Sequence, residues 1–472
     1  MTVRSERRTL ILIAVIGLAL RLLATPFPGH KYDVRAFLSW SEWLARNPLS
    51  AFYATDHATP PDHLPGDLLV FAGIGRAALA MAPGFDFTSW YADLLMRLVP
   101  MLADIGLGLL VYVFARRQTD ARTALIAAAV MIFNPGLYTT SAVWGQWDSF
   151  AALLLMGALL LALRGRTVTI WPLLTYLVLI KPQFIVFGIL ILLYLARQAM
   201  SQMRDGRSGA APFRSSGAAI SPPGRRSTQG RPRPLRDLGH ASTFVRLGRD
   251  LAIGGVLSVL VFVLVCFPFD VGFPLQSGMR WSILDRVSFA VNRYDDITLG
   301  AQNIWALLGK HLGDPDGAAL MTGITYEQAG RVLLALGLAL AVVTVLTIRP
   351  PEWALLGASF TAAMSIYGFP TRVHERYMLP ALVLLLFMWP LVPRLLPVAI
   401  GLSLTFTCSL VMAMWWEEFW HLDSIDMALA AINLALFGWA VAEIVRRGRE
   451  RGREAAPAGA PGVYPSSGTY LP

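Results

Sequence analysis

ADLLMRLVPMLADIGLGLLVYVFA, residues 92–115, is a nearly continuous apolar run that ends just before the basic pair Arg116–Arg117. A helix needs about 20 predominantly apolar residues to cross the hydrocarbon core of a bilayer. Similar runs recur from residue 9 to residue 445, 55% of the residues are hydrophobic, and the mean hydropathy is +0.54. The sequence therefore predicts an all-α polytopic membrane protein without a large soluble domain.

Three charged residues interrupt this run. Asp93, Arg97 and Asp104 are spaced by four and seven residues, which places them on one face of the predicted helix. Charged groups at membrane depth are costly unless they are paired, so this face must contact protein or water. We interpret the three residues as an internal ion-pair network with a supporting role, and direct contact with a substrate is the alternative.

The apolar runs predict about twelve membrane spans. The stretch from Leu64 to Ala82 is also apolar, but counting it as a span would place the Arg116 cluster outside the membrane. We therefore predict that it is an external helix lying on the membrane. The twelve predicted spans are residues 9–26, 92–115, 122–141, 147–163, 167–181, 183–197, 248–267, 330–348, 353–370, 377–392, 395–414 and 427–445.

The basic residues follow the positive-inside rule. With the N-terminus inside, the connections at 116–122 and 164–166, the long loop after Arg197 and the tail from Arg446 all fall in the cytoplasm. Both termini are therefore predicted to be cytoplasmic. These helix ends and loops account for the net charge of +10, so nucleic acid is not an expected partner.

Composition divides the chain into two membrane modules joined by a polar loop. The loop is rich in Arg, Gly, Ser and Pro, and the tail in Ala, Pro and Gly, so both are predicted to be disordered in the cytoplasm. Anionic membrane lipids would attract the basic loop. The predicted units are 1–198 with a first external loop at 27–91, the polar loop 199–247, 248–445 with an external loop at 268–329, and the tail 446–472.

Asp33 follows the first span after a few residues and begins the segment DVRAFLSWSEWL. Apolar residues recur every three to four positions in it, which predicts an amphipathic helix in the first external loop. A carboxylate at this place can simply stabilise the helix N-terminus, and composition alone favours that interpretation. In the functional interpretation Asp33 is a general base that accepts a proton from an attacking hydroxyl.

A second external segment, 144–149, combines two indoles, an amide and a carboxylate. Trp144 and Trp147 fit an interfacial aromatic belt as well as a sugar-binding surface. Gln146 and Asp148 indicate hydrogen bonding to a polyhydroxyl ligand.

Two single cations lie near the outer surface. Lys181 precedes Pro182, which breaks the helix between two short spans. Arg21 lies near the outer end of the first span. Each side chain either extends to the interface or binds a phosphate.

The segment TRVHERY, residues 371–377, brings clustered basic charge to an external surface that otherwise avoids it. Arg372, His374 and Arg376 occupy alternate positions, so they can converge on an anion from a loop, and guanidinium groups match phosphate oxygens. His374, Glu375 and Arg376 are consecutive and point in different directions on a helix, so they do not form a metal site.

Together, Asp33 in the first external loop, the segment WGQWDS at 144–149, the Lys181–Pro182–Gln183 turn and RVHERY at 372–377 resemble the membrane glycosyltransferases of the C superfamily. The likeness is to bacterial relatives of the GPI-anchor mannosyltransferases and the dolichol-pathway glucosyltransferases. It covers roughly residues 9–392 and depends on the order and common external placement of the motifs.

The resemblance implies an inverting transfer of a hexose, mannose or glucose, from a polyprenyl-phosphate donor to a lipid or glycan acceptor. The enzyme would lie in a bacterial cytoplasmic membrane with its active site on the external face. Metal use varies across this superfamily, and we predict that this protein needs no metal or other cofactor. Asp33 would deprotonate the acceptor hydroxyl while cationic side chains stabilise the departing phosphate. The donor-phosphate residues would be Lys181, Arg372, His374, Arg376 and Arg21. The sugar-binding residues would be Gln146, Asp148, Trp144 and Trp147, with Glu375, Asp93, Arg97 and Asp104 in supporting roles.

The sequence departs from this family in two places. Many relatives have a second acidic residue close behind the first, whereas the next acid after Asp33 is Glu42, so Asp56 and Asp62 are alternative bases. The family also does not explain the insertion at 197–247.

Two other classes of protein compete with this interpretation. A transporter or lipid-linked-glycan flippase would also have many spans and buried charges, but here the polar clusters gather at one surface. A non-catalytic assembly subunit of an envelope polysaccharide complex is the third alternative.

Overall fold

The computed structural model describes residues 2–27, 29–207, 241–273, 278–415 and 423–454 of the 472-residue chain. Most of the predicted polar loop, 208–240, and most of the predicted tail, 455–472, lie outside the described residues. The flanking helices extend further than the apolar runs indicated, because one continues to Arg207 and the next begins at Ala241.

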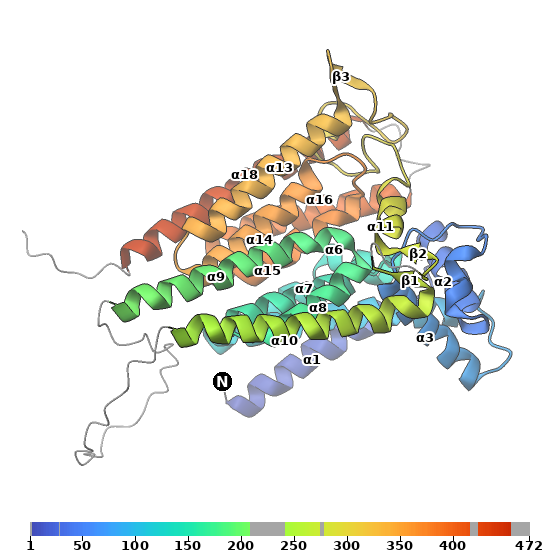
Figure 1. Ribbon diagram of the computed structural model, residues 1–472, viewed down its shortest axis with the longest axis horizontal. Coiled ribbons are helices and arrows are strands. Elements are labelled where there is room, and N and C mark those ends of the chain that lie inside the picture. The colour runs from blue at the N-terminus through green and yellow to red at the C-terminus, as the bar shows by residue number, and fades with distance from the viewer. Residues whose placement is uncertain (1, 28, 208–240, 274–277, 416–422, 455–472) are drawn as a thin grey trace, which may run out of the picture.

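The described chain is a bundle of long helices with short elements gathered at one end (Figure 1). Two pairs of short strands complete it: β1 (Val271–Gly272) pairs in parallel with β2 (Trp281–Ser282), and β3 (Ala319–Met321) pairs antiparallel with β4 (Ile324–Thr325). The helices are α1 (Val3–Leu23), α2 (Lys31–Arg46), α3 (Pro65–Met81), α4 (Trp90–Arg116), α5 (Ala121–Ile132), α6 (Pro135–Tyr138), α7 (Asp148–Leu163), α8 (Thr167–Ile180), α9 (Ile185–Arg207), α10 (Ala241–Cys266), α11 (Ile283–Val291), α12 (Ile304–Leu307), α13 (Tyr326–Thr347), α14 (Pro351–Gly368), α15 (Leu379–Met388), α16 (Leu396–Met414) and α18 (Asp423–Glu454).

The protein is an all-α polytopic membrane protein. Among the described residues, seven helical segments are long and apolar enough to cross a membrane, so the prediction of about twelve spans is wrong in number. The seven segments are Trp90–Arg116, Ala121–Trp144, Pro182–Met203, Phe244–Phe269, Tyr326–Thr347, Pro393–Met414 and Ser424–Arg451.

The count falls because an apolar run in the sequence does not reveal the length and surroundings of the helix. Each of the other predicted spans does contain a helix. However, α7 and α8 have 16 and 14 residues, or about 24 and 21 Å at 1.5 Å per residue, and the hydrocarbon core is about 30 Å thick. The helix α15 has only 10 residues. The helix α1 carries four charged residues in its first two turns. The 18-residue helix α14 is less apolar than the seven segments listed above.

The two predicted external loops meet at one end of the bundle. Figure 1 shows α2 and α3 at the same end as β1, β2 and α11, whereas the N-terminus and the final turns of α9 and α18 lie at the opposite end. The apolar stretch at 64–82 forms α3, which packs on α2 and on α8. Side chains that are separated by more than 200 residues in the sequence are therefore neighbours at this end.

Two apolar clusters hold the fold together. The larger surrounds α14 and α15, whose side chains are almost all buried among the neighbouring helices. The smaller joins α2, α3 and the first turns of α4 to the end of α10, with Phe37, Phe71 and Phe269 at its centre. Full burial of such a side chain contributes roughly 1.5–3 kcal/mol, so the second cluster fixes the first external loop against the bundle.

The charged face of α4 divides into two ion pairs rather than one network. Arg97 lies 3.2 Å from Asp93 and donates hydrogen bonds to the carbonyl oxygens of Phe27 and Ala142. Asp104 instead accepts a 3.0 Å hydrogen bond from Arg21 Nε of α1. The Arg21 and Asp104 side chains are 1% and 0% exposed, so this pair joins α1 to α4 inside the bundle.

We predict that Asp104→Asn destabilises the protein by about 3–5 kcal/mol, because it leaves the Arg21 guanidinium buried without a counter-charge. The melting temperature of the purified protein in detergent measures the effect. Glu42→Gln is the matched control, because the Glu42–Arg46 pair is 41% and 46% exposed and should contribute about 1 kcal/mol or less. Equal melting temperatures for the two variants would contradict the structural role of the Arg21–Asp104 pair.

Candidate functional site

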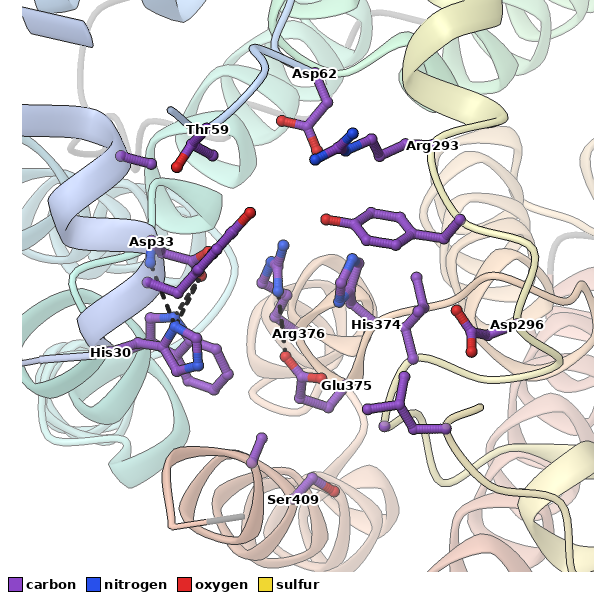
Figure 2. Close-up of a pocket in the computed structure, with 18 of the residues that line it drawn as sticks. His30, Asp33, Thr59, Asp62, Arg293, Asp296, His374, Glu375, Arg376 and Ser409 are labelled. Carbon is purple, nitrogen blue, oxygen red and sulfur yellow. Dashed lines mark hydrogen bonds and ion pairs between the residues drawn. The ribbon is translucent and has the colours of Figure 1, made fainter. Parts of the chain in front are cut away.

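A cavity of about 420 Å³ lies where the two external loops meet the bundle. One wall comes from α2 and the segment 59–63, and the opposite wall from the segments 293–302 and 374–376. Figure 2 shows Asp33 and His30 facing Arg376 and His374 across this space, with Asp62 and Arg293 together at one edge. The cavity therefore combines carboxylates, imidazoles and guanidinium groups from distant parts of the chain.

Asp33 lies in the first turn of α2, but its carboxylate does not cap the helix. The cap is His30, whose Nδ1 accepts a 3.4 Å hydrogen bond from the Asp33 N–H. Asp33 Oδ2 accepts hydrogen bonds from Trp144 Nε1 at 2.8 Å and from Gln146 Nε2 at 2.5 Å. No described residue donates to Oδ1, so this oxygen can accept a proton from a molecule in the cavity.

Asp33 is held as an anion. Burial by itself would raise its pKa, but the charge of Arg376, the nearby His30 and the two hydrogen bonds bring the pKa below its ordinary value. His30 stacks on the Trp144 ring with 4.7 Å between ring centroids. Burial lowers the pKa of His30; the Asp33 charge opposes this shift and the Arg376 charge adds to it, and the net lowering favours a neutral ring at neutral pH.

Arg376 provides a partly buried positive charge in the cavity wall. It lies in the short helix Glu375–Met378, 3.4 Å from Glu375 Oε1 and 3.9 Å from Asp148 Oδ2. Burial opposes its charge, yet the carboxylates of Asp33, Glu375 and Asp148 raise its pKa. Lys181 pairs with Asp148 and is not in the cavity wall, so this ion pair supports Arg376 from behind.

His374 lines the cavity as a neutral imidazole. Burial and the adjacent Arg376 hold its pKa well below the ordinary value. Its ring packs edge-on against Tyr294 and Tyr377, with centroid distances of 5.7 and 5.6 Å. It can therefore exchange hydrogen bonds with a bound oxygen, but it does not add a positive charge to the site.

Arg372 lies outside the cavity wall, although the alternating pattern placed it beside His374 and Arg376. Its backbone is left-handed, with φ of 63°, whereas His374 is extended, so successive alternate side chains diverge. The guanidinium binds Asp316 through Nε at 2.7 Å and also contacts Glu327 and Asn292. Arg372 therefore attaches the segment 371–376 to the second external loop.

The other predicted binding residues occupy different environments. Trp144 lines the cavity, whereas Gln146 contributes through its hydrogen bond to Asp33. Trp147 packs in the apolar cluster of the first loop, 4.8 Å from the Phe71 ring. Arg21 is bound to Asp104 inside the bundle and does not line the cavity.

Sequence reasoning did not single out several residues of the cavity wall. Asp62, named above as an alternative base, lines the cavity, whereas Glu42 and Asp56 do not. The missed residues include His63, Arg293, Tyr294 and Asp296. For His63 a signal existed, because Asp67 follows it by four residues at the start of an apolar helix, where the two side chains share a face.

The site is interpreted from its own geometry. Comparison with models of known protein families finds no match, and comparison with curated proteins finds none either. Within the described ranges, no group of three or more His, Cys, Asp or Glu side chains is arranged to hold a metal ion.

We predict that Arg372→Gln destabilises the external loops, because Asp316 is 3% exposed and would lose its charged partner. A buried pair of this kind contributes about 3 kcal/mol when one partner is removed. Limited proteolysis in the second external loop should become faster and the melting temperature should fall. Arg331→Gln is the control, because Arg331 also binds Glu327 but is 70% exposed. Identical proteolysis of both variants would show that Arg372 does not hold this loop.

Proposed function

We propose that this protein is an inverting glycosyltransferase that moves a hexose, mannose or glucose, from a polyprenyl-phosphate donor to a lipid or glycan acceptor. The observation that carries the proposal is that an anionic Asp33, whose Oδ1 accepts no hydrogen bond from a described residue, lines the same cavity as the partly buried Arg376. This pairing supplies a base for the acceptor and a cation for the donor phosphate. The motif resemblance to C-superfamily membrane glycosyltransferases supports the same reaction.

The reaction needs one proton transfer and one displacement. Asp33 Oδ1 takes the proton of an acceptor hydroxyl, whose oxygen attacks the anomeric carbon of the donor sugar. The new bond forms as the bond from the anomeric carbon to the phosphate oxygen breaks, and the electron pair leaves with the polyprenyl phosphate. Attack opposite the leaving group inverts the anomeric configuration.

Arg376 acts on the leaving group. Negative charge grows on the phosphate in the transition state, and a fixed guanidinium in a partly buried site stabilises it without reorganisation. The Lys181–Asp148 pair and Glu375 hold Arg376 in place, and His374 offers a neutral hydrogen bond. Of the proposed phosphate-binding residues, Arg376 and His374 line the cavity, whereas Lys181, Arg372 and Arg21 contribute through the structure around it.

The arrangement in the membrane follows from the same proposal. The cavity end of the bundle faces the external side of a bacterial cytoplasmic membrane, and both termini face the cytoplasm. Met412 and Ala413 of α16 form an apolar part of the cavity wall, where the prenyl chain of the donor can leave for the bilayer. A transporter or flippase is the second candidate, because buried ion pairs such as Arg21–Asp104 also occur in transporters.

We predict that Asp33→Asn lowers the rate of transfer by about 10²–10⁴-fold, because it removes the proton acceptor. The assay supplies synthetic polyprenyl-phosphate mannose or glucose to the purified protein, with a crude lipid and glycan extract as acceptor, and follows the transferred sugar. Asp56→Asn is the control, because Asp56 lies outside the cavity wall. Loss of transfer in Asp62→Asn but not in Asp33→Asn would assign the base to Asp62, and no transfer by the unchanged protein would favour the transporter.

We predict that Trp144→Phe moves the acid limb of the pH–rate profile to higher pH. The pKa of Asp33 is below its ordinary value, so the base is active above that pKa and is lost as the pH falls through it. Removing the 2.8 Å hydrogen bond from Trp144 Nε1 raises this pKa. Trp147→Phe should leave the limb unchanged, because Trp147 Nε1 has no partner among the described residues. A shift in both variants, or in neither, would remove Asp33 as the group that sets the limb.

A further inference from the structure

His63 lines the cavity and is paired with Asp67 behind it, and the proposed reaction does not use this pair. His63 Nδ1 bonds to Asp67 Oδ2, and the Asp67 carboxylate is 1% exposed. Asp67 lies in the first turn of α3, and its Oδ1 accepts a 3.1 Å hydrogen bond from the Leu68 N–H. The helix N-terminus thus stabilises the buried carboxylate, which in turn orients the imidazole.

The imidazole of His63 lines the cavity. Its ring packs edge-on against both Phe37 and Trp40, at centroid distances of 5.2 and 5.3 Å. No described residue bonds to Nε2, and the side chain is 21% exposed in the cavity wall. The pair therefore presents one oriented nitrogen to a bound molecule.

The backbone carbonyl oxygens of the segment that carries His63 accept hydrogen bonds from side chains of three different elements. Trp40 Nε1 of α2 donates to the Thr59 oxygen at 3.0 Å, and Arg286 of α11 donates to the Pro61 oxygen at 2.7 Å. The Tyr53 hydroxyl donates to the oxygen of His63 itself at 2.9 Å. A side chain on such a restrained segment needs little ordering when it binds a ligand.

The charges around His63 favour its protonated form. Burial would lower its pKa, but the charge and hydrogen bond of Asp67 raise it above the ordinary value. Asp62 acts in the same direction and Lys181 in the opposite one. Phe37 and Trp40 are uncharged, so the charge near the ring comes from Asp67, Asp62 and Lys181. In the protonated form Nε2–H is a hydrogen-bond donor.

The cavity as a whole favours a neutral ligand on this side. Its lining includes the five carboxylates of Asp33, Asp62, Asp296, Glu375 and Asp426, against the guanidinium groups of Arg293 and Arg376 and the imidazole of His63. Carboxylates accept hydrogen bonds from hydroxyl groups but repel anions. A polyhydroxyl molecule can use both the carboxylates and the imidazole donor, whereas a second anion beside the donor phosphate would be repelled.

We propose that the acceptor is a neutral glycoside that spans from Asp33 to the His63–Asp67 pair, with His63 Nε2–H donating a hydrogen bond to one of its oxygens. Asp33, Phe37 and Trp40 share one face of α2, and the rise of 1.5 Å per residue puts His63 about 6–10 Å along the helix from Asp33. One hydroxyl of the glycoside thus contacts the Asp33 carboxylate, while another oxygen of the same molecule accepts the hydrogen bond from His63. His63 is a residue that positions the acceptor, and this role rests on the proposed transferase function.

The experiment measures acceptor binding without donor and transfer with donor. Isothermal titration of the purified protein in lipid nanodiscs uses p-nitrophenyl α-mannoside and α-glucoside as neutral probes and p-nitrophenyl β-glucuronide as the anionic probe. His63→Ala should weaken binding of the neutral probes by about tenfold or more, the effect of losing a charged hydrogen bond. His63→Gln, which keeps a neutral donor, should restore much of it. His57→Gln is the control, because His57 belongs to the same loop but lies outside the cavity wall.

The pH dependence separates binding by His63 from a purely structural role. The pKa of His63 is raised in the folded protein, so neutral-probe binding should be strong below that pKa and weaken as the pH rises through it. In Asp67→Asn this loss should move to lower pH, and in His63→Gln it should disappear. The melting temperature of each variant confirms that it is folded. An alkaline loss that is unchanged in His63→Gln would overturn the proposal.

The binding measurement and the transfer measurement together distinguish the proposed transferase function from the proposed role of His63. If probe binding depends on His63 but neither donor supports transfer, the protein has a glycoside-binding site and the proposal of a transferase is wrong. Transfer with an unchanged KM for the acceptor in His63→Ala would retain the transferase and reject the positioning role. Tighter binding of the glucuronide, or no binding of the neutral probes to the unchanged protein, would overturn the neutral acceptor.

Discussion

Arg376 interacts with three carboxylates, those of Asp33, Glu375 and Asp148, and its charge sets the state of the groups around it. It keeps the Asp33 carboxylate ionised despite burial and helps to keep His30 and His374 neutral. A buried guanidinium is stable only when its counter-charges are in place. This end of the bundle is therefore organised around the partly buried Arg376, whose partners come from α2, α7 and the segment before α15.

The rest of the external structure holds these partners at the correct separation. Aromatic packing of the first loop fixes α2 and α3, and the backbone hydrogen bonds from Trp40, Tyr53 and Arg286 restrain the segment at 59–63. Arg372 ties the segment that carries Arg376 to the second external loop. Each of these contacts joins parts of the chain that are distant in sequence, so the shape of the cavity depends on all of them.

Residue patterns in the sequence predicted some features of the site but not others. The spacing of apolar residues after Asp33 predicted a helix there, and α2 begins two residues earlier. Patterns could not reveal that His30 caps this helix, because capping depends on a backbone turn and on the contact with Trp144. Alternate positions in the segment 371–377 predicted that Arg372 would join His374 and Arg376, but the left-handed backbone at Arg372 separates them. The number of spans was overestimated because an apolar run does not show where its helix ends, and α7, α8 and α15 are too short to count as spans.

The sequence by itself determined that this is an all-α membrane protein, because burial of apolar surface in a bilayer depends mainly on the length and composition of each run. It also determined which segments carry charged side chains at the end of the bundle where the external loops meet. Only the tertiary structure decided which charges share a cavity. Arg21 and Asp104 form a pair inside the bundle, Arg372 anchors the segment 371–376, and His63 lines the cavity while Asp67 holds it from behind. The physical reason is that electrostatic and hydrogen-bond energies depend on distances and burial, which arise only when the helices pack.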